Sequence, residues 1–250
     1  LAALSLSLSL IDALFDEDEK WLIEELAVNG TQMKDICLEL YGNDSDRARN
    51  SVKKRWGATF GIVGRGRIGT AAGLRAKALG MKVMFYDPFI PDGGDQSVGF
   101  ERRETLEELL RESDIVTVHT PLTDETRGMI NGQAISCMKK DAILINTSRG
   151  EVVDVDAVTE ALKADRLAAA GLDVLPQEPP DPTHPLFSAL KNREEWTVGR
   201  VIVTPHAAWY SPDGARDCRE KAARTVINYL TEGTIRNCVN EQFLKQGDAS

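Results

Sequence analysis

The sequence predicts an α/β protein in which a doubly wound parallel sheet follows a small all-helical segment. From residue 59 onward, short apolar runs alternate with helical runs, and this alternation is typical of parallel strands that are covered on both faces. A glycine-rich turn follows the first of these runs directly, and the chain before it shows only helical spacing. The six predicted strands are TFGIV (59–63), KVMFY (82–86), DIVTVHT (114–120), AILINT (142–147), AAGLDVL (169–175) and VIVTPH (201–206).

The chain before the first strand is predicted to be helical. Apolar residues recur there at helical spacing, Asn29-Gly30 interrupts the first helix, and Ser45 or Asp46 can cap a third helix that carries five Lys and Arg residues. The predicted domains are a helical N-terminal segment (1–56), a nucleotide-binding domain (57–234) and a C-terminal tail (235–250).

Composition excludes several classes of protein. Apolar residues make up 42% of the 250 residues and charged residues 28%, which is typical of a globular chain rather than a disordered one. A net charge of −9 argues against nucleic-acid binding by the whole chain. No apolar run reaches about 20 residues, so we expect no membrane span. The four cysteines are widely spaced, so we expect no metal site and a cytoplasmic or nuclear protein.

The turn after the first strand carries the strongest motif. Gly64, Gly66 and Gly69 form G-x-G-x-x-G between a strand and a helix. The first glycine permits a tight turn, the second lets the backbone approach a pyrophosphate, and the third lets helix and strand pack closely. Asp87 ends the second strand, where a carboxylate binds the adenosine ribose and repels a 2′-phosphate. The sequence therefore predicts a Rossmann domain that binds NAD rather than NADP.

Three polar residues follow later strands and suggest hydride chemistry. Arg149, Glu178 and His206 each lie just beyond a strand, at the sheet edge where ligands bind in open α/β folds. Each residue alone is explained by a solvated or structural role, but their joint position at this edge favours a catalytic role. His206 would act as general base, Glu178 would orient it, and Arg149 would hold a substrate carboxylate. We expect His119 to pack or to tune the cofactor pocket, and His184 to be solvated.

Several motifs in order resemble a known family. GIVGRGRIG, the DP after the second strand, HTPLTDETRGMIN, INTSRGEVVD, GLDV-x3-EP and TPHAAWYS are similar to the D-isomer-specific 2-hydroxyacid dehydrogenases. AAWYS and the late NCVN resemble the subgroup of C-terminal-binding proteins, which are transcriptional corepressors. The match covers about residues 57–240. It implies hydride transfer between NAD(H) and a small 2-hydroxy or 2-oxo acid, and a homodimer formed through the nucleotide domain.

The resemblance also implies the roles of individual residues. Arg149, Glu178 and His206 match the family's catalytic Arg, Glu and His. Asp173 would contact the nicotinamide carboxamide, and Trp209 would line the substrate pocket, although plain core packing explains Trp209 as well. The residues implied at the cofactor are Gly64, Gly66, Arg67, Ile68, Gly69, Asp87, Thr120, Pro121, Thr126, Thr147 and Asp173.

The N-terminal part departs from the family. Members carry a flavodoxin-like substrate domain before the nucleotide fold, and residues 1–56 are too short for one and lack βα alternation, so the chain alone could be inactive. Residues 16–56 weakly resemble a Myb/SANT or helix-turn-helix domain, and their basic last helix could meet DNA phosphates. The alternative function is therefore an NAD-sensing transcriptional regulator. A solvated helical appendage or an unrelated exon joined in error also explains this segment.

Overall fold

The computed structural model describes residues 57–94, 97–236 and 238. The predicted helical segment 1–56, including the possible DNA-binding stretch 16–56, lies outside these residues. The chain divides into two compact units, and the boundary falls after Ala208. That boundary lies inside the range 57–234, which the sequence predicts to be one domain.

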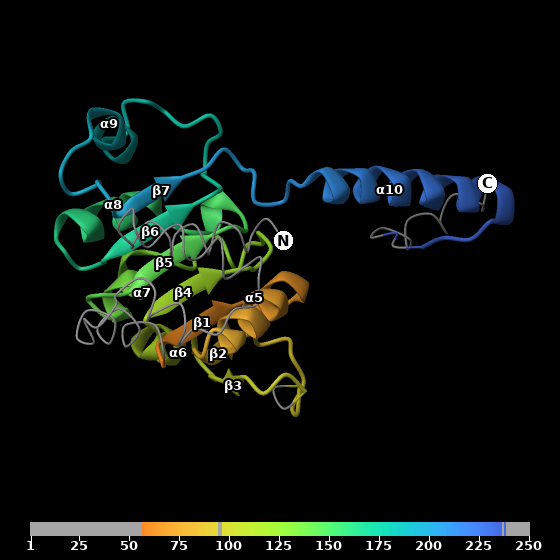
Figure 1. Ribbon diagram of the computed structural model, residues 1–250, viewed down its shortest axis with the longest axis horizontal. Helices are drawn as coiled ribbons and strands as arrows, with labels where there is room; N and C mark the ends of the chain where they lie inside the picture. Colours follow the sequence, from red (N-terminus) through yellow and green to blue (C-terminus); the bar gives the residue numbers. More distant parts are fainter. Residues whose placement is uncertain (1–56, 95–96, 237, 239–250) are drawn as a thin grey trace, which may run out of the picture. The chain divides into compact units, whose positions relative to one another are not determined.

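The first unit contains the predicted doubly wound parallel sheet (Figure 1). Among the described residues it has seven strands in the order β3-β2-β1-β4-β5-β6-β7, and every neighbouring pair is parallel. The order reverses between β1 and β4, which is the position where open α/β sheets bind their ligands. The strands are β1 Thr59–Val63, β2 Lys82–Tyr86, β3 Glu101–Arg102, β4 Ile115–Val118, β5 Ile143–Asn146, β6 Ala169–Leu172 and β7 Val201–Val203.

Helices connect most of the strands, and several begin at well-defined caps. Thr105 and Glu108 form a reciprocal capping box at the start of α6, and the Asp154 side chain accepts a hydrogen bond from the first turn of α8. The helices of this unit are α5 Arg67–Ala78, α6 Leu106–Glu112, α7 Gly132–Cys137, α8 Val155–Lys163 and α9 Pro185–Asn192, with a 3-10 turn at Gly150–Val152.

Alternate residues of the strands build two hydrophobic clusters, one on each face of the sheet. Phe60 and Ile62 of β1 and Phe85 of β2 pack with α5, whereas Met84 and Val116 pack with the helices α6 to α8. Both faces of the central strands are therefore buried. This explains why their sequences are continuously apolar instead of alternating.

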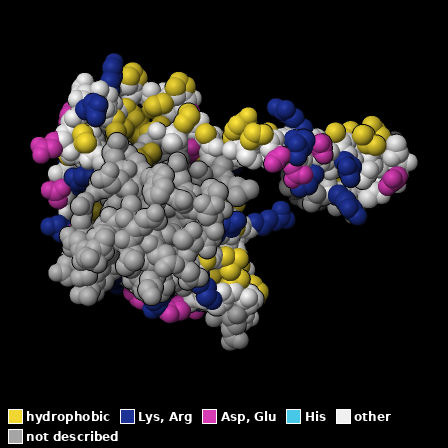
Figure 2. Space-filling view, in the orientation of Figure 1, with side chains coloured by type: hydrophobic (Ala, Val, Ile, Leu, Met, Phe, Trp, Pro, Cys, Tyr) yellow, Lys and Arg dark blue, Asp and Glu magenta, His cyan; other side chains and the backbone are white. Residues whose placement is uncertain are grey.

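The second unit begins at Trp209, and its described part contains the long helix α10, Pro212–Glu232. Ser211 caps its start, and Gly233 ends it in the left-handed conformation. Figure 2 shows both charged and apolar side chains on its surface. Of the helices in the described part of the chain, none combines the length and the hydropathy needed to cross a bilayer.

Candidate active site

The glycine turn after β1 has the geometry that the motif predicts. Gly64 has a φ of +88°, which is unfavourable for residues with a side chain. A Cβ atom on Gly64 would also lie 2.8 Å from the Thr120 side chain, and one on Gly69 would lie 2.4 Å from the Gly64 carbonyl oxygen. These short distances show that the end of β1, the start of α5 and the end of β4 lie close together.

Gly66 faces open space at the start of α5. A Cβ atom added there would meet no atom of the described residues within 4 Å, and no capping side chain among them accepts a hydrogen bond from the N-terminus of α5. The first amides of the helix therefore lack a side-chain partner, and the backbone can be approached closely. This arrangement fits the pyrophosphate of a dinucleotide. Arg67 and Ile68, in the same first turn, are both exposed, as residues that contact a ligand need to be.

Asp87 lies beside the glycine turn, as its position after β2 predicts. One carboxylate oxygen accepts a hydrogen bond from the Arg65 backbone N–H at 2.9 Å, and the other accepts one from Phe89 at 3.0 Å. The side chain is only partly buried. The carboxylate is thus held at the carboxyl end of β2, next to the turn that fits the pyrophosphate.

The predicted threonines fall into two groups. The hydroxyl groups of Thr120 and Thr147, at the ends of β4 and β5, are buried and have no hydrogen-bond partner among the described residues. A polar ligand at this edge would satisfy them, so they fit a cofactor. The Thr126 hydroxyl instead donates to the Pro121 carbonyl at 2.6 Å and accepts from the Thr123 N–H, so it stabilises its own loop. Pro121 itself is exposed.

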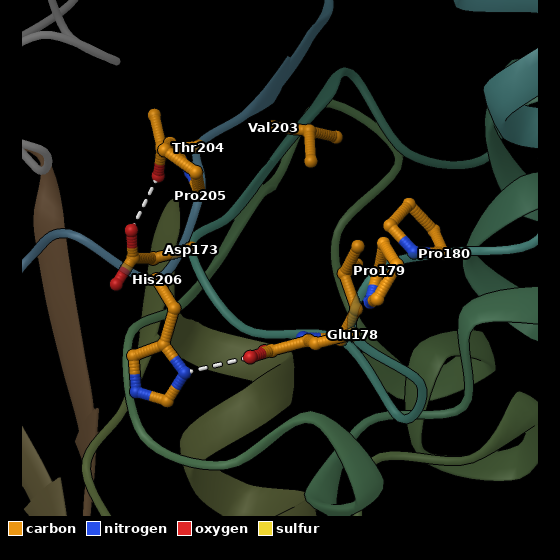
Figure 3. Close-up of a pocket in the computed structure, with 9 residues that line it drawn as sticks. Asp173, Glu178, Pro179, Pro180, Val203, Thr204, Pro205 and His206 are labelled. Carbon is orange, nitrogen blue, oxygen red and sulfur yellow. Dashed lines mark hydrogen bonds and ion pairs between the residues drawn. The ribbon is translucent and has the colours of Figure 1, made fainter.

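Glu178 and His206 form a pair at the opposite half of the same sheet edge (Figure 3). The His206 Nδ1 atom lies 2.8 Å from the Glu178 carboxylate. A carboxylate at Nδ1 fixes the ring so that Nε2 remains for a substrate. The pair borders a cavity of about 420 Å³. The cavity is lined by Asp173, Leu175, Glu178, Pro179, Pro180, Val203, Thr204, Pro205 and His206.

Asp173 holds the turn that carries His206. Its carboxylate accepts hydrogen bonds from the Thr204 hydroxyl at 2.5 Å, from Ala207 N–H at 2.8 Å and from Ala208 N–H at 2.9 Å. His206 has a φ of +52°, a left-handed conformation that is uncommon among residues other than glycine. Strained residues of this kind concentrate at functional sites. Asp173 is 2% exposed, and in this structure its carboxylate stabilises the turn that carries His206. Its predicted contact with the nicotinamide stays a prediction.

Arg149 lies on the turn after β5, and that turn packs against the loop of Glu178. A Cβ atom on the neighbouring Gly150 would lie 1.9 Å from the Leu175 carbonyl carbon. The two backbones therefore touch, and the arginine turn is fixed to the loop that leads to Glu178. The Arg149 side chain is exposed, and its Nη1 atom donates to the Ser148 carbonyl at 2.7 Å. The remaining guanidinium N–H groups can bind a carboxylate.

Three other predicted residues have different surroundings. Trp209 belongs to the second unit, where it is 63% exposed and packs edge-on against Tyr210, and its role in the substrate pocket stays a prediction. Burial lowers the pKa of His119 to about 4, which agrees with a role other than proton transfer near neutral pH. His184, which we expect to be solvated, is partly exposed; its Nε2 atom lies 2.9 Å from the exposed Asp156 carboxylate, and its Nδ1 atom accepts from Leu186 N–H.

Sequence reasoning missed two residues that organise the site. Asn146 is fully buried at the end of β5, where its side chain bonds to Ser148 and to the Arg149 carbonyl. A polar residue that ends the apolar run ILIN was the available signal. No signal in the sequence indicated Gly150, because Leu175, against which it packs, lies far away in the sequence. Within residues 57–94, 97–236 and 238, no cluster of His, Cys, Asp or Glu is arranged to hold a metal ion.

At acidic pH, Glu178 should contribute less to the free energy of unfolding. The hydrogen bond from Leu175 N–H lowers the pKa of Glu178 below its ordinary value of 4.5, and His206 adds to this shift while partial burial opposes it. A depressed pKa stabilises the folded state above pH 4.5, and the stabilisation is lost as the pH falls through the lowered pKa. We expect Glu178→Gln to reduce the free energy of unfolding at about pH 6, and to reduce it less at about pH 3. Urea unfolding at both pH values tests this expectation, and an equal loss at both would contradict it.

Comparisons with known proteins identify the family. A family model for the D-isomer specific 2-hydroxyacid dehydrogenase NAD binding domain matches residues 31–208, so the match also covers part of the predicted helical segment. A glyoxylate reductase of Korarchaeum cryptofilum is 42% identical over 190 residues, which cover 76% of this chain and 54% of that protein. C-terminal-binding protein 1 of Caenorhabditis elegans is 36% identical over 206 residues, which cover 79% of this chain and 27% of that protein.

A solved structure agrees with these relatives. The NAD-complexed D-isomer specific 2-hydroxyacid dehydrogenase of Lactobacillus delbrueckii ssp. bulgaricus superposes with a TM-score of 0.63 at 32% identity, over 73% of this chain and 56% of that one. The chain thus spans about half the length of this enzyme and of the archaeal reductase, and a smaller share of the nematode protein. The family resemblance predicted from the motifs is confirmed. The chain belongs to the D-isomer specific 2-hydroxyacid dehydrogenase family, and its parallel sheet is the NAD binding domain of that family.

Proposed function

We propose that this protein transfers hydride between NAD(H) and a small 2-hydroxy or 2-oxo acid. The observation that carries the proposal is the hydrogen-bonded Glu178–His206 pair on the same sheet edge as the glycine turn. The printed names of the relatives, a glyoxylate reductase and a 2-hydroxyacid dehydrogenase, agree with this substrate class.

The residues of this chain would divide the chemistry among them. When bound, the nicotinamide cofactor would supply the acceptor for the hydride of C2 in the hydroxy acid, or the hydride donor for the 2-oxo acid in the reverse direction. His206 takes the hydroxyl proton on Nε2, while Glu178 keeps the other ring nitrogen hydrogen-bonded and stabilises the imidazolium that forms. The Leu175 N–H keeps Glu178 ionised, because it bonds to the carboxylate. Arg149 binds the substrate carboxylate through its guanidinium group.

The cofactor half of the proposal rests on the glycine turn. Gly64, Gly66 and Gly69 would hold the pyrophosphate against the first amides of α5, and Asp87 would bind the adenosine ribose. Thr120 and Thr147 would use their unpartnered hydroxyl groups. We expect a homodimer formed through this domain, as the family resemblance implies.

A titration of the purified chain with NADH, followed by cofactor fluorescence, tests the binding step. We expect Gly66→Ala to weaken NADH binding by about tenfold or more, because the new methyl group occupies the open approach to the backbone amides. The fold should tolerate this change, because the methyl group meets no atom of residues 57–94, 97–236 and 238 within 4 Å. Gly132→Ala, the same change at the start of α7, is the matched control and should leave binding unaltered. If the unmodified chain did not bind NADH at millimolar levels, the proposed function would be excluded.

The similarity to C-terminal-binding protein 1 supports a second candidate function, an NAD-sensing transcriptional regulator. Its proposed DNA-binding segment, residues 16–56, lies outside the described residues. A salt titration of DNA binding by fluorescence anisotropy separates the two candidates. Contacts to phosphates require the affinity to fall steeply as the salt concentration rises.

A further inference from the structure

Arg65 is a buried cation at the centre of the glycine turn, between Gly64 and Gly66. The residue is only 9% exposed. Its guanidinium carbon lies 4.6 Å from the centre of the Phe85 ring, and the Nη2 atom lies close to Gly94, in the loop after β2. The guanidinium group is therefore packed between the end of β2 and the loop that follows it. Asp87 stands at the start of that loop.

No carboxylate among the described residues forms an ion pair with Arg65. The neighbouring arginines differ, because Arg102 pairs with Asp92 and Glu104, and Arg103 pairs with Glu101 and Glu112. In the part of the chain that the structure describes, the Nε atom of Arg65 is buried without a hydrogen-bond partner. Burying an unpaired charge is unfavourable, and the contact with the Phe85 ring offsets only part of that penalty. An anionic ligand would supply the missing partner.

The position of Arg65 indicates which part of a dinucleotide would supply that charge. The backbone N–H of Arg65 donates to Asp87 at 2.9 Å, so Arg65 and the carboxylate expected at the adenosine ribose are direct neighbours. Asp87 alone would repel a phosphate group on the ribose 2′ position. The guanidinium group lies against the ring of Phe85, which is on β2 shortly before Asp87, so its positive charge stands at the same end of β2 and would offset part of that repulsion.

We propose that Arg65 lets this protein bind NADP(H) as well as NAD(H), with the guanidinium group pairing with the 2′-phosphate. The inference rests on the dinucleotide site of the proposed function, and it changes the specificity that Asp87 alone predicts. Arg65 is then a specificity residue for the adenosine end of the cofactor, remote from the proton chemistry at His206.

The test compares the dissociation constants for NADH and NADPH in the full chain. We expect the unmodified chain to bind the two cofactors within about tenfold of each other, and Arg65→Leu to lose about tenfold or more in NADPH affinity relative to NADH. Arg65→Lys keeps the charge and should recover part of the NADPH affinity. Asp87→Ala should shift the ratio the other way, towards NADPH, because it removes the opposing carboxylate.

Arg75→Leu is the matched control, because it removes the same charge from an exposed position on α5 and should leave the ratio unchanged. An equal loss of NADH and NADPH affinity in Arg65→Leu would assign the residue a purely structural role and overturn the inference. NADH binding without measurable NADPH binding by the unmodified chain would also overturn it, and the proposed function would stand. A chain that binds neither cofactor would exclude the proposed function itself.

Discussion

Gly150→Ala should strongly destabilise the first unit. The new Cβ atom would lie 1.9 Å from the Leu175 carbonyl carbon, 2.1 Å from its oxygen and 2.4 Å from the Pro176 nitrogen. These atoms belong to the backbone, so no side-chain rotation can relieve the overlap. The loop leading to Glu178 would have to move away from the turn of Arg149. We expect the free energy of unfolding to fall by about 3 kcal/mol, at the upper end of the usual range for overpacking.

Urea unfolding followed by circular dichroism measures this loss as a lower midpoint at an unchanged slope. Gly132→Ala is the control, because its new Cβ atom would meet only the Ala157 Cβ, at an ordinary distance of 3.7 Å. Alanine favours a helix over glycine, so the control should be neutral or slightly stabilising. A midpoint for Gly150→Ala equal to that of the control would show that the two loops do not pack as the structure has them.

The sheet could be predicted because its signals are local. TFGIV and KVMFY match β1 and β2 with unchanged boundaries, since glycine follows the first run, aspartate follows the second, and both runs are largely buried. The later strands end earlier than predicted. Asp173 and Thr204 had been assigned to strands, but both leave the sheet and hydrogen-bond to each other. The edge strand β3 was missed, because its two residues, Glu101 and Arg102, carry no apolar pattern.

The site was harder to predict than the sheet, because its geometry depends on contacts between residues that are far apart in the sequence. The positions of Glu178 and His206 after two strands predicted that they would meet, and they do. The left-handed backbone of His206 could not be predicted, since it depends on hydrogen bonds from its turn to Asp173, 33 residues earlier. The charge of Arg65 was visible in the sequence, but its burial without a carboxylate partner was not.

His206→Gln should remove hydride transfer and leave cofactor binding intact. Glutamine can still donate a hydrogen bond to Glu178, but it cannot take or deliver a proton near neutral pH. We expect kcat for NADH oxidation with glyoxylate or pyruvate to fall by about 10²- to 10⁴-fold, the usual contribution of general acid–base catalysis. The dissociation constant for NADH should change little, because the glycine turn lies at β1 and His206 follows β7.

A second variant and a matched control separate proton chemistry from folding at this position. His206→Asn also lacks the proton-accepting ring, and asparagine tolerates the left-handed backbone that His206 adopts at φ +52°. It should therefore fold normally and remain equally inactive. His184→Gln is the control, because His184 forms a similar pair with Asp156 at 2.9 Å outside the proposed chemistry, and it should retain full turnover. If both His206 variants turned over as fast as the control, the transferred proton would have to pass through another group, and the pair with Glu178 would be structural.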